Sequence, residues 1–248
     1  MRTIFAHRGV SSLAPENTLS AIKLCTDYQV RWFECDIDIL HDGTIVLFHD
    51  STLDRCTNRS GSLFALNRQD LDQIDAGNWF GDEYRDERIP TLEQLIAMMN
   101  QYQLNANIEI KSGDVSAEAS HRLLAGLDRA LNQLDDGREY IISSFNPMLL
   151  AEFKRLRPQA RVACLFETHT LNDDWHMIME WTGAECIHPQ NEGLTQQQVQ
   201  LFKSKGYQVN VWTVNTKDRA NQLFNWGVDG IFTDFPQHLP KYSQLNDV

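Results

Sequence analysis

Two carboxylates, Glu34 and Asp36, stand two positions apart in an apolar run that predicts a β-strand. Residues two apart on a strand share one face, so both carboxylates point the same way. Two like charges that converge in an inward-facing site are costly unless a cation or a proton lies between them. Glu109 alternates with apolar residues in a second predicted strand and is followed by Lys111. We therefore expect Glu109 to join the pair as a third carboxylate.

These three carboxylates would offer only oxygen atoms to a ligand. The chain has no Cys-x-x-Cys pair and no His-x-x-x-His motif that would indicate zinc. Oxygen ligands suit one hard divalent cation, Mg²⁺ or Ca²⁺ with Mn²⁺ as a further candidate, completed by water and substrate oxygens. The spacing fits an ordinary alternative equally well, in which Glu34 and Asp36 are surface charges on an edge strand and Glu109 only pairs with Lys111.

Histidines end two of the predicted strands, His7 at the first and His49 at a short strand that follows a hairpin. Both would reach the same rim as the carboxylates. Histidine titrates near neutral pH, so two imidazoles beside a metal-bound phosphate are suited to act as acid and base. Arg8 offers planar donors to phosphate oxygens, and Lys111 adds a compact positive charge. A single histidine at such a position is more often an ordinary core or loop residue.

Two further residues at strand ends carry weaker signals. His188 is placed to face a pocket, but no neighbour in the sequence decides its role. Trp212 is a core residue by default, or a wall for the alcohol part of a substrate. The other histidines are interpreted as ordinary core or loop residues, namely His41, His121, His169, His176 and His238.

Short apolar or β-branched runs alternate with longer stretches of helical period, which is typical of βαβ units around a parallel sheet. Asp42-Gly43 predicts a tight hairpin, so residues 45–48 are expected to fold back antiparallel on the strand before them. A (β/α)8 barrel needs about 250 residues, and the chain has 248. We therefore predict an α/β protein with one (β/α)8 barrel domain over residues 1–248. The candidate barrel strands are residues 3–7, 31–39, 106–111, 140–144, 161–166, 185–188, 208–213 and 229–233.

The alternation fails between residues 51 and 88, which are polar and rich in turn formers apart from a short helical patch at 69–74 and the aromatic pair Trp79-Phe80. We interpret residues 51–88 as a small insertion after the second barrel strand. Insertions in such barrels usually lie on loops at the catalytic face. This one is expected to cover the active site as a cap.

The charge balance limits the class of partner. The chain carries 22 Lys and Arg against 34 Asp and Glu, a net charge of −12. This average surface would repel a long polyanion, so nucleic acid is not expected as a partner. An anionic small molecule would need a local positive centre, either a cation or a few well-placed Arg and Lys side chains.

Cysteine usage and the start of the chain bear on location. The five cysteines are odd in number and widely spaced, which favours a reducing compartment. The apolar run at residues 4–6 is far too brief for a signal-peptide core or a membrane span. We expect a cytoplasmic protein without stable membrane association. The sequence does not determine the oligomeric state.

Several short segments stand in a specific joint order, although each is weak alone. They are His7-Arg8-Gly9, Pro15-Glu16-Asn17-Thr18, Glu34-x-Asp36, Asp42-Gly43, His49-Asp50, Ile108-Glu109-Ile110-Lys111, Val211-Trp212-Thr213-Val214-Asn215 and Gly227-Val228-Asp229-Gly230-Ile231-Phe232-Thr233-Asp234. Together they closely resemble glycerophosphodiester phosphodiesterases, from about residue 3 to about residue 236.

This resemblance implies a (β/α)8 barrel with a small insertion after His49 and metal-dependent hydrolysis of small glycerophosphodiesters such as glycerophosphocholine and glycerophosphoethanolamine. The products would be sn-glycerol 3-phosphate and an alcohol, in the breakdown of glycerophospholipid head groups. The chain is most similar to the bacterial cytosolic members. The roles that carry over are metal ligation by Glu34, Asp36 and Glu109, acid/base catalysis by His7 and His49, and phosphate contact by Arg8 and Lys111.

The sequence leaves several alternatives open. It does not say which histidine is the acid, or whether water attacks directly or the glycerol 2-hydroxyl first forms a cyclic phosphate. A phospholipase acting on membrane lipids or lysolipids is the nearest other enzyme, but it needs an apolar surface for acyl chains. A non-catalytic binding module on the same fold is a further alternative, because fold alone does not establish function.

Overall fold

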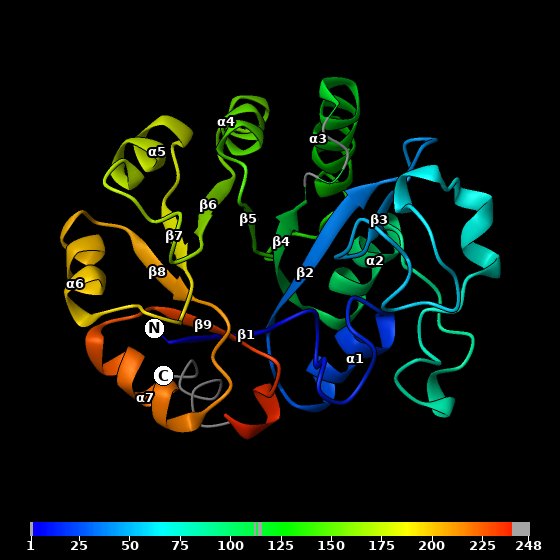
Figure 1. Ribbon diagram of the computed structural model, residues 1–248, viewed down its shortest axis with the longest axis horizontal. Coiled ribbons are helices and arrows are strands. Elements are labelled where there is room, and N and C mark those ends of the chain that lie inside the picture. The colour runs from blue at the N-terminus through cyan, green and yellow to red at the C-terminus, as the bar shows by residue number, and fades with distance from the viewer. Residues whose placement is uncertain (1, 112, 114–115, 240–248) are drawn as a thin grey trace.

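The computed structural model describes residues 2–111, 113 and 116–239. The strands are β1 (Thr3–Ala6), β2 (Trp32–Ile39), β3 (Ile45–Leu47), β4 (Asn105–Ile110), β5 (Tyr140–Ser144), β6 (Arg161–Phe166), β7 (Cys186–Pro189), β8 (Gln208–Val211) and β9 (Gly230–Thr233). All except β3 form a closed parallel barrel in the order β1, β2, β4, β5, β6, β7, β8, β9, which returns to β1 (Figure 1). The predicted (β/α)8 barrel is confirmed.

Helices connect successive barrel strands and lie around the outside of the barrel (Figure 1). They are α1 (Leu19–Asp27), α2 (Leu92–Tyr102), α3 (Ala117–Leu131), α4 (Pro147–Leu156), α5 (Trp175–Thr182), α6 (Gln196–Ser204) and α7 (Lys217–Trp226). After β9 the described chain ends in the short 3₁₀ helix Pro236–His238. None of the helices within the described residues is both long and apolar enough to span a bilayer.

The hairpin prediction is also confirmed. β3 pairs antiparallel with β2 on the outer side of the ring, with Ile45 opposite Ile39. The turn is stabilised by the Asp42 carboxylate, which accepts a 2.9 Å bond from the backbone N–H of Thr44. Gly43 has φ +94°, a conformation that side chains disfavour, which explains why glycine follows Asp42.

Strand alternation separates an outer apolar layer from a barrel interior. On β2, the side chains of Phe33, Cys35 and Ile37 are fully buried in the main core against the helices. Glu34 and Asp36 alternate with them and therefore face the interior. Apolar side chains fill the interior away from these carboxylates, where the rings of Phe5 and Phe232 stack with centroids 4.6 Å apart. The strand alternation thus directs the carboxylates into the barrel.

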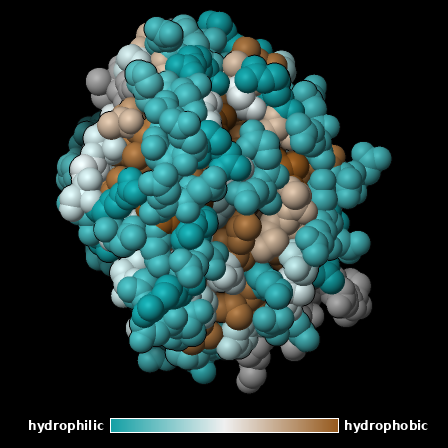
Figure 2. Space-filling model, turned by 90° about the vertical axis from the view of Figure 1, so that its right-hand side faces the viewer, coloured by the Kyte–Doolittle hydropathy of each residue, from teal (hydrophilic) through white to brown (hydrophobic). Residues whose placement is uncertain are grey.

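The segment between β3 and α2 contains three short 3₁₀ helices, Leu63–Ala65, Arg68–Gln73 and Asp82–Tyr84. The predicted helical patch at 69–74 is therefore 3₁₀ helix. The segment has its own apolar cluster, formed by Leu40, Val46, Phe48, Leu53, Cys56, Leu63, Leu71, Ile74, Ala76 and Ile89. Because this cluster includes residues of β3 and of the loop beside it, the segment is packed onto the barrel wall. Its outer face is mainly hydrophilic, with hydrophobic residues gathered near the middle of the view (Figure 2).

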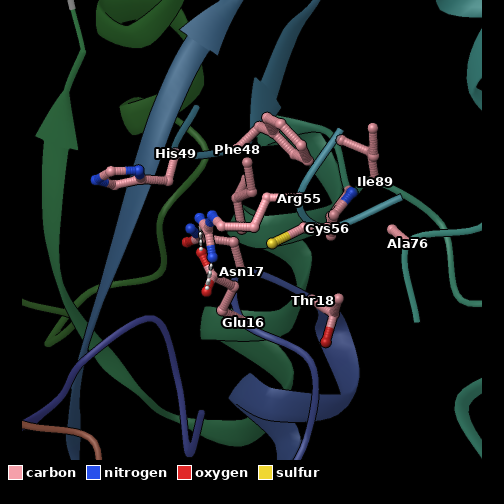
Figure 3. Close-up of a pocket in the computed structure, with 11 residues that line it drawn as sticks. Glu16, Asn17, Thr18, Phe48, His49, Arg55, Cys56, Ala76 and Ile89 are labelled. Carbon is pink, nitrogen blue, oxygen red and sulfur yellow. Dashed lines mark hydrogen bonds and ion pairs between the residues drawn. The ribbon is translucent and has the colours of Figure 1, made fainter. Parts of the chain in front are cut away.

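The inserted segment also contacts the loop before α1. Cys56, Ala76 and Ile89 face Asn17 and Thr18 across a gap of about 10 Å³, too small for a ligand (Figure 3). A further bond joins the two, because the Tyr84 hydroxyl donates to the backbone carbonyl of Leu13 at 2.6 Å. These contacts place the insertion beside the loop that follows β1.

This packing generates a stability prediction. Leu63→Ala should lower the free energy of unfolding by about 2–5 kcal/mol, the cost of a cavity at a fully buried leucine, because Leu63 is 0% exposed in the cluster shared with β3. Urea denaturation followed by circular dichroism measures the change. Leu127→Ala in the main core, also 0% exposed, is the matched comparison. A loss below about 0.5 kcal/mol would mean that the insertion opens independently of the barrel.

Candidate active site

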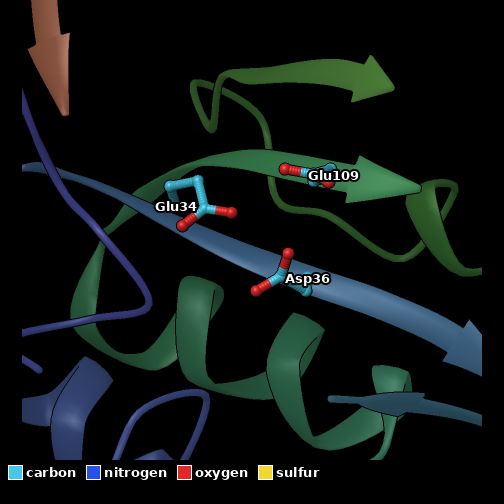
Figure 4. Close-up of side chains that lie close together, drawn as sticks. All are labelled: Glu34, Asp36 and Glu109. Carbon is cyan, nitrogen blue, oxygen red and sulfur yellow. The ribbon is translucent and has the colours of Figure 1, made fainter. Parts of the chain in front are cut away.

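Three carboxylates converge at one end of the barrel interior. Glu34 and Asp36 extend from β2, and Glu109 extends from β4, where the strand register places it directly opposite Asp36 (Figure 4). One oxygen atom from each side chain lies within 4.8 Å of the others. The three residues are buried, with exposed fractions of 3%, 1% and 9%. The interpretation of Glu34 and Asp36 as surface charges is therefore wrong.

Burial and mutual repulsion disfavour the ionised form of these carboxylates. Burial raises the pKa of Glu34 well above its usual range, and the Asp36 and Glu109 carboxylates raise it further. Burial also raises the pKa of Glu109, followed by repulsion from Asp36, against the opposing effect of Lys111. For Asp36 the penalty of burial is outweighed by Arg8 and Lys111, which bring its pKa to about 2.

The cluster fits a hard divalent cation. It offers carboxylate oxygens, which Mg²⁺, Ca²⁺ and Mn²⁺ prefer. One of these oxygens, Oε1 of Glu34, is buried without a hydrogen-bond partner among the described residues. A buried acceptor in this state is costly, and a bound cation would satisfy it.

Arg8 and Lys111 are the cationic groups beside the carboxylates. Arg8 Nε lies 3.3 Å from Asp36 Oδ2, and Lys111 Nζ lies 3.6 Å from Asp36 Oδ1. Lys111 Nζ also contacts Glu109 Oε1 at 2.8 Å, so the expected pairing of Glu109 with Lys111 exists alongside the carboxylate cluster. Both side chains line the same cavity as Glu34 and Glu109.

The backbone after β1 adopts an unusual conformation to place Arg8. Arg8 has φ +56°, and its N–H donates to Glu34 Oε2 at 2.9 Å. Gly9 follows with φ +80°, and a Cβ at this position would lie 2.7 Å from the backbone carbon of Ala21. Only glycine therefore fits between Arg8 and α1.

Asn17 stabilises the carboxylate cluster from the loop before α1. Its amide donates to Asp36 Oδ2 at 2.8 Å, and its carbonyl oxygen accepts from the Asp36 backbone N–H at 3.1 Å. Its own N–H donates to the Arg8 carbonyl at 3.1 Å. From the sequence Asn17 was a candidate cap of the first helix and not a site residue. The structure gives the cap to Thr18, whose side chain accepts from the Ala21 N–H.

Each candidate histidine is held by a carboxylate through Nδ1. His7 Nδ1 lies 2.7 Å from Asp234 Oδ1, and His49 Nδ1 lies 2.6 Å from Asp50 Oδ1. With Nδ1 bonded in this way, Nε2 of each ring is left for other contacts. His7 Nε2 lies 3.9 Å from Glu34 Oε2, which places it over the carboxylate cluster.

The surroundings of His49 favour its neutral form. Burial lowers the pKa of His49, and the positive charges of Arg8 and Lys111 lower it further. These effects outweigh Asp36 and Asp50, which act in the opposite direction. The imidazole is therefore neutral at neutral pH.

Asp234 and Asp50 were not selected from the sequence as site residues. Asp234 follows β9 and is itself held by the Asn215 amide at 2.7 Å. Asp234 directly follows the barrel strand β9, and the ends of barrel strands meet at the catalytic rim. Asp50 directly follows the candidate catalytic residue His49. These two positions are the signals that indicate them.

A cavity of about 320 Å³ connects the carboxylates, the cations and the histidines. Its other side is largely aromatic, because Phe145 and Trp212 meet edge to face with centroids 5.5 Å apart. Trp212 thus forms part of the cavity wall, one of the two positions that the sequence left open. The lining residues are His7, Arg8, Glu34, His49, Asn107, Glu109, Lys111, Phe145, Leu165, Glu167, Trp212 and Phe232.

His188 lies inside the barrel and does not line this cavity. It is 0% exposed, its Nε2 lies 3.0 Å from the Asn210 amide nitrogen, and burial lowers its pKa to about 3. His188 is therefore a neutral imidazole that packs inside the barrel. Its backbone carbonyl accepts a 2.8 Å bond from the Trp212 indole, so it also helps to orient the cavity wall.

Comparison with known sequences places these features in a family. Residues 7–238 match the glycerophosphoryl diester phosphodiesterase family. A glycerophosphodiester phosphodiesterase of Caldanaerobacter subterraneus subsp. tengcongensis is 33% identical over 236 residues, which cover 95% of each chain. A glycerophosphodiester phosphodiesterase of Bacillus subtilis is 29% identical and covers 95% of this chain and 84% of that protein.

Comparison with solved structures agrees. A phosphodiesterase of Oleispira antarctica, solved in complex with the product sn-glycerol-3-phosphate, superposes with a TM-score of 0.91. It is 32% identical, and the match covers 97% of this chain and 96% of that one.

The carboxylate cluster generates a binding prediction. Titration with Mg²⁺ or Mn²⁺ in a calorimeter should show one saturable site, and Asp36→Asn or Glu109→Gln should weaken it by at least about 10-fold, because each removes a negative ligand. Glu93→Gln on the exposed face of α2 is the control and should bind normally. Equal affinity in all four proteins would place the cation elsewhere.

Proposed function

The chain belongs to the glycerophosphoryl diester phosphodiesterase family and is a phosphoric diester hydrolase of glycerophosphodiesters, and from this premise we propose a metal-dependent hydrolysis in which His7 and His49 transfer the protons. The proposed substrates are glycerophosphocholine and glycerophosphoethanolamine. The proposed products are sn-glycerol 3-phosphate and an amino alcohol. The cytoplasm is the proposed location.

One observation carries this proposal. Two imidazoles, each held through Nδ1 by its own carboxylate, line one cavity with Glu34 and Glu109, which belong to a cluster of three buried carboxylates that could hold a cation. A binding module has no chemical need for this combination, whereas hydrolysis of a diester needs two proton transfers and neutralisation of phosphate charge.

Glu34, Asp36 and Glu109 are the residues that would hold the cation. When bound, a divalent cation supplies positive charge that stabilises the charge developing on phosphate oxygens. Arg8 and Lys111 add to this charge and orient the diester. The planar guanidinium suits bidentate contact with phosphate, and the ammonium acts as a compact charge.

The two histidines then divide the proton transfers. One imidazole removes the proton from the attacking hydroxyl as its oxygen forms a bond to phosphorus. The other imidazole donates a proton to the departing alcohol oxygen as its bond to phosphorus breaks. The attacking hydroxyl belongs to water, or to the glycerol 2-hydroxyl with water opening the cyclic phosphate afterwards. Both routes consume one molecule of water and cleave one P–O bond in the net reaction. In the cyclic route the bond between phosphorus and the glycerol 2-oxygen forms in the first step and breaks in the second.

The side of the cavity away from the carboxylates is suited to bind a cationic head group. Phe145 and Trp212 present aromatic faces and edges, and Glu167 adds a carboxylate. Aromatic rings attract quaternary ammonium groups. Arg8 and Lys111 make one end of the cavity positive, and Glu167 makes the other end negative. This arrangement complements a choline or ethanolamine phosphodiester, in which the phosphate is negative and the nitrogen is positive.

We propose a cap role for the insertion at residues 51–88 within a single barrel domain. Its hydrophilic outer face and its own buried cluster favour water-soluble substrates over membrane lipids (Figure 2). Comparison of glycerophosphocholine with lysophosphatidylcholine as substrates tests this choice.

The histidine roles generate a kinetic prediction. His7→Ala and His49→Ala should each lower kcat on glycerophosphocholine by roughly 10²–10⁴-fold, the usual range for a general acid or base. In a glycerol phosphodiester of 4-nitrophenol, the leaving group departs without a proton. The variant that lacks the acid should therefore be impaired far less on this substrate than on glycerophosphocholine. The variant that lacks the base should be impaired on both substrates. Initial rates of both variants on both substrates therefore identify the acid.

The control is His121→Ala, because His121 is exposed on α3 outside the barrel. It should retain full activity. Near-normal kcat in both His7→Ala and His49→Ala would show that the acid/base assignment is wrong.

The head-group interpretation generates a separate prediction. Glu167→Gln should lower kcat/KM for glycerophosphocholine roughly 2–5-fold, as expected for an exposed pair of opposite charges worth ~0.5–1 kcal/mol. It should leave kcat/KM for glycerophosphoglycerol unchanged, because that head group is neutral. Equal effects on the two substrates would exclude a charge contact at Glu167 while leaving the hydrolysis itself intact.

A further inference from the structure

We propose that Arg55 of the insertion is a positioning residue that joins the phosphate-binding Arg8 to the proton-transferring His49. Arg55 bonds two carboxylates at once, and each of them also bonds one of these two residues. The inference rests on the proposed roles of Arg8 and His49. It assigns to the insertion a part in the chemistry that goes beyond covering the cavity.

The first half of the connection runs through Glu16. Arg55 Nη1 and Nη2 donate to Glu16 Oε2 and Oε1 at 2.7 and 2.8 Å (Figure 3). Glu16 Oε1 also accepts from Arg8 Nη1 at 2.7 Å. Glu16 therefore holds one end of the Arg8 guanidinium, while Arg8 Nε faces Asp36 at 3.3 Å. The direction in which Arg8 points depends on Glu16.

The second half runs through Asp50. Arg55 Nε and Nη2 donate to Asp50 Oδ2 and Oδ1 at 2.7 and 3.0 Å. Asp50 Oδ1 also lies 2.6 Å from His49 Nδ1. The Asp50 carboxylate therefore orients the His49 ring, and Arg55 orients the carboxylate. Figure 3 shows His49 and Glu16 on different sides of Arg55, coming from separate segments of the chain.

Only arginine can make this connection. All three guanidinium nitrogens are used, in a planar fork that engages two carboxylates together. Lysine has a single ammonium nitrogen, which cannot bond all four oxygens of the Glu16 and Asp50 carboxylates and so cannot fix their orientations. The Arg55 side chain is 46% exposed, so anchoring in the apolar cluster of the insertion does not account for its contacts.

The carboxylates are suited to the role because both are ionised. Burial would raise the pKa of Glu16, but the bonds from Arg55 and the charge of Arg8 hold it below its usual value. The bond from Arg55 is the largest effect on Asp50 and contributes to a pKa of about 2. Loss of Arg55 would leave two negative groups beside Arg8 and His49 without their shared counter-charge.

The test compares Arg55→Ala and Arg55→Lys with Arg59→Ala, which removes an arginine of the same insertion that bonds only Gln73 and its own loop among the described residues. Both Arg55 variants should lose about 10–100-fold in kcat/KM on glycerophosphocholine, the range found when a residue that orients a metal or substrate contact is removed. Arg59→Ala should retain wild-type kcat/KM. Methylguanidine should restore part of the activity of Arg55→Ala.

The two halves should separate kinetically. Glu16→Gln should mainly raise KM because it releases Arg8, and Asp50→Asn should mainly lower kcat because it releases His49. Replacing Arg55 in a chain that already carries both changes should cost less than about 3-fold, since coupled residues are not additive. A full additional loss would overturn the route through Glu16 and Asp50.

Other outcomes are equally decisive. If Arg8→Ala and His49→Ala are inactive while Arg55→Ala retains more than half of the wild-type activity, the connection is wrong and the proposed function stands. If Arg8→Ala and His49→Ala are themselves active, the proposed function fails first. A loss of thermal stability in Arg55→Ala that accounts for its low activity, without rescue by methylguanidine, would assign Arg55 a structural role and overturn the inference.

Discussion

Burial of three carboxylates within 4.8 Å of one another is the constraint on which the rest of the site depends. Each ionised group removed from water costs several kcal/mol, and like charges add repulsion. Arg8 and Lys111 both contact Asp36, and with all three carboxylates ionised the cluster keeps one net negative charge. A divalent cation would change this to one net positive charge. That is the charge needed to receive a phosphodiester, which carries one negative charge, on a protein whose overall charge is −12.

The strand register and one strained loop make this cluster possible. Parallel pairing of β2 with β4 sets Glu109 directly opposite Asp36, and the two-residue period places Glu34 on the same face. The left-handed backbone at Arg8 lets its N–H reach Glu34 while its side chain reaches Asp36. Positive φ at a residue with a side chain is costly and persists where surrounding contacts impose it. Here the bond to Glu34 and the close packing of Gly9 against α1 impose it.

Sequence patterns predicted the barrel and the outer hairpin because both depend on local periodicity and turn residues. The convergence of Glu109 with Glu34 and Asp36 depends on strand pairing, and the family resemblance was needed to favour it over surface charges. The structure ends the first strand at Ala6 and leaves His7 in the rim loop, a difference of one residue that does not move the side chain from the site. The same patterns did not predict how deeply a side chain near a strand end is buried in the barrel. His188 and Trp212 lie near the ends of their strands, yet one is fully buried and the other lines the cavity. Asp234 and Arg55 were missed because their partners lie far away in the sequence, at separations of 227 positions for His7 and Asp234 and 39 positions for Arg55 and Glu16.

The two histidines therefore depend on different parts of the fold. His49 is oriented by the adjacent Asp50 and, through it, by the insertion. His7 is oriented by Asp234, which reaches it only because β9 pairs with β1 and closes the barrel. Correct placement of His7 thus requires the last strand, whereas placement of His49 requires the inserted segment. If His7 and His49 carry the two proton transfers as proposed, the hydrolysis depends on both barrel closure and packing of the insertion.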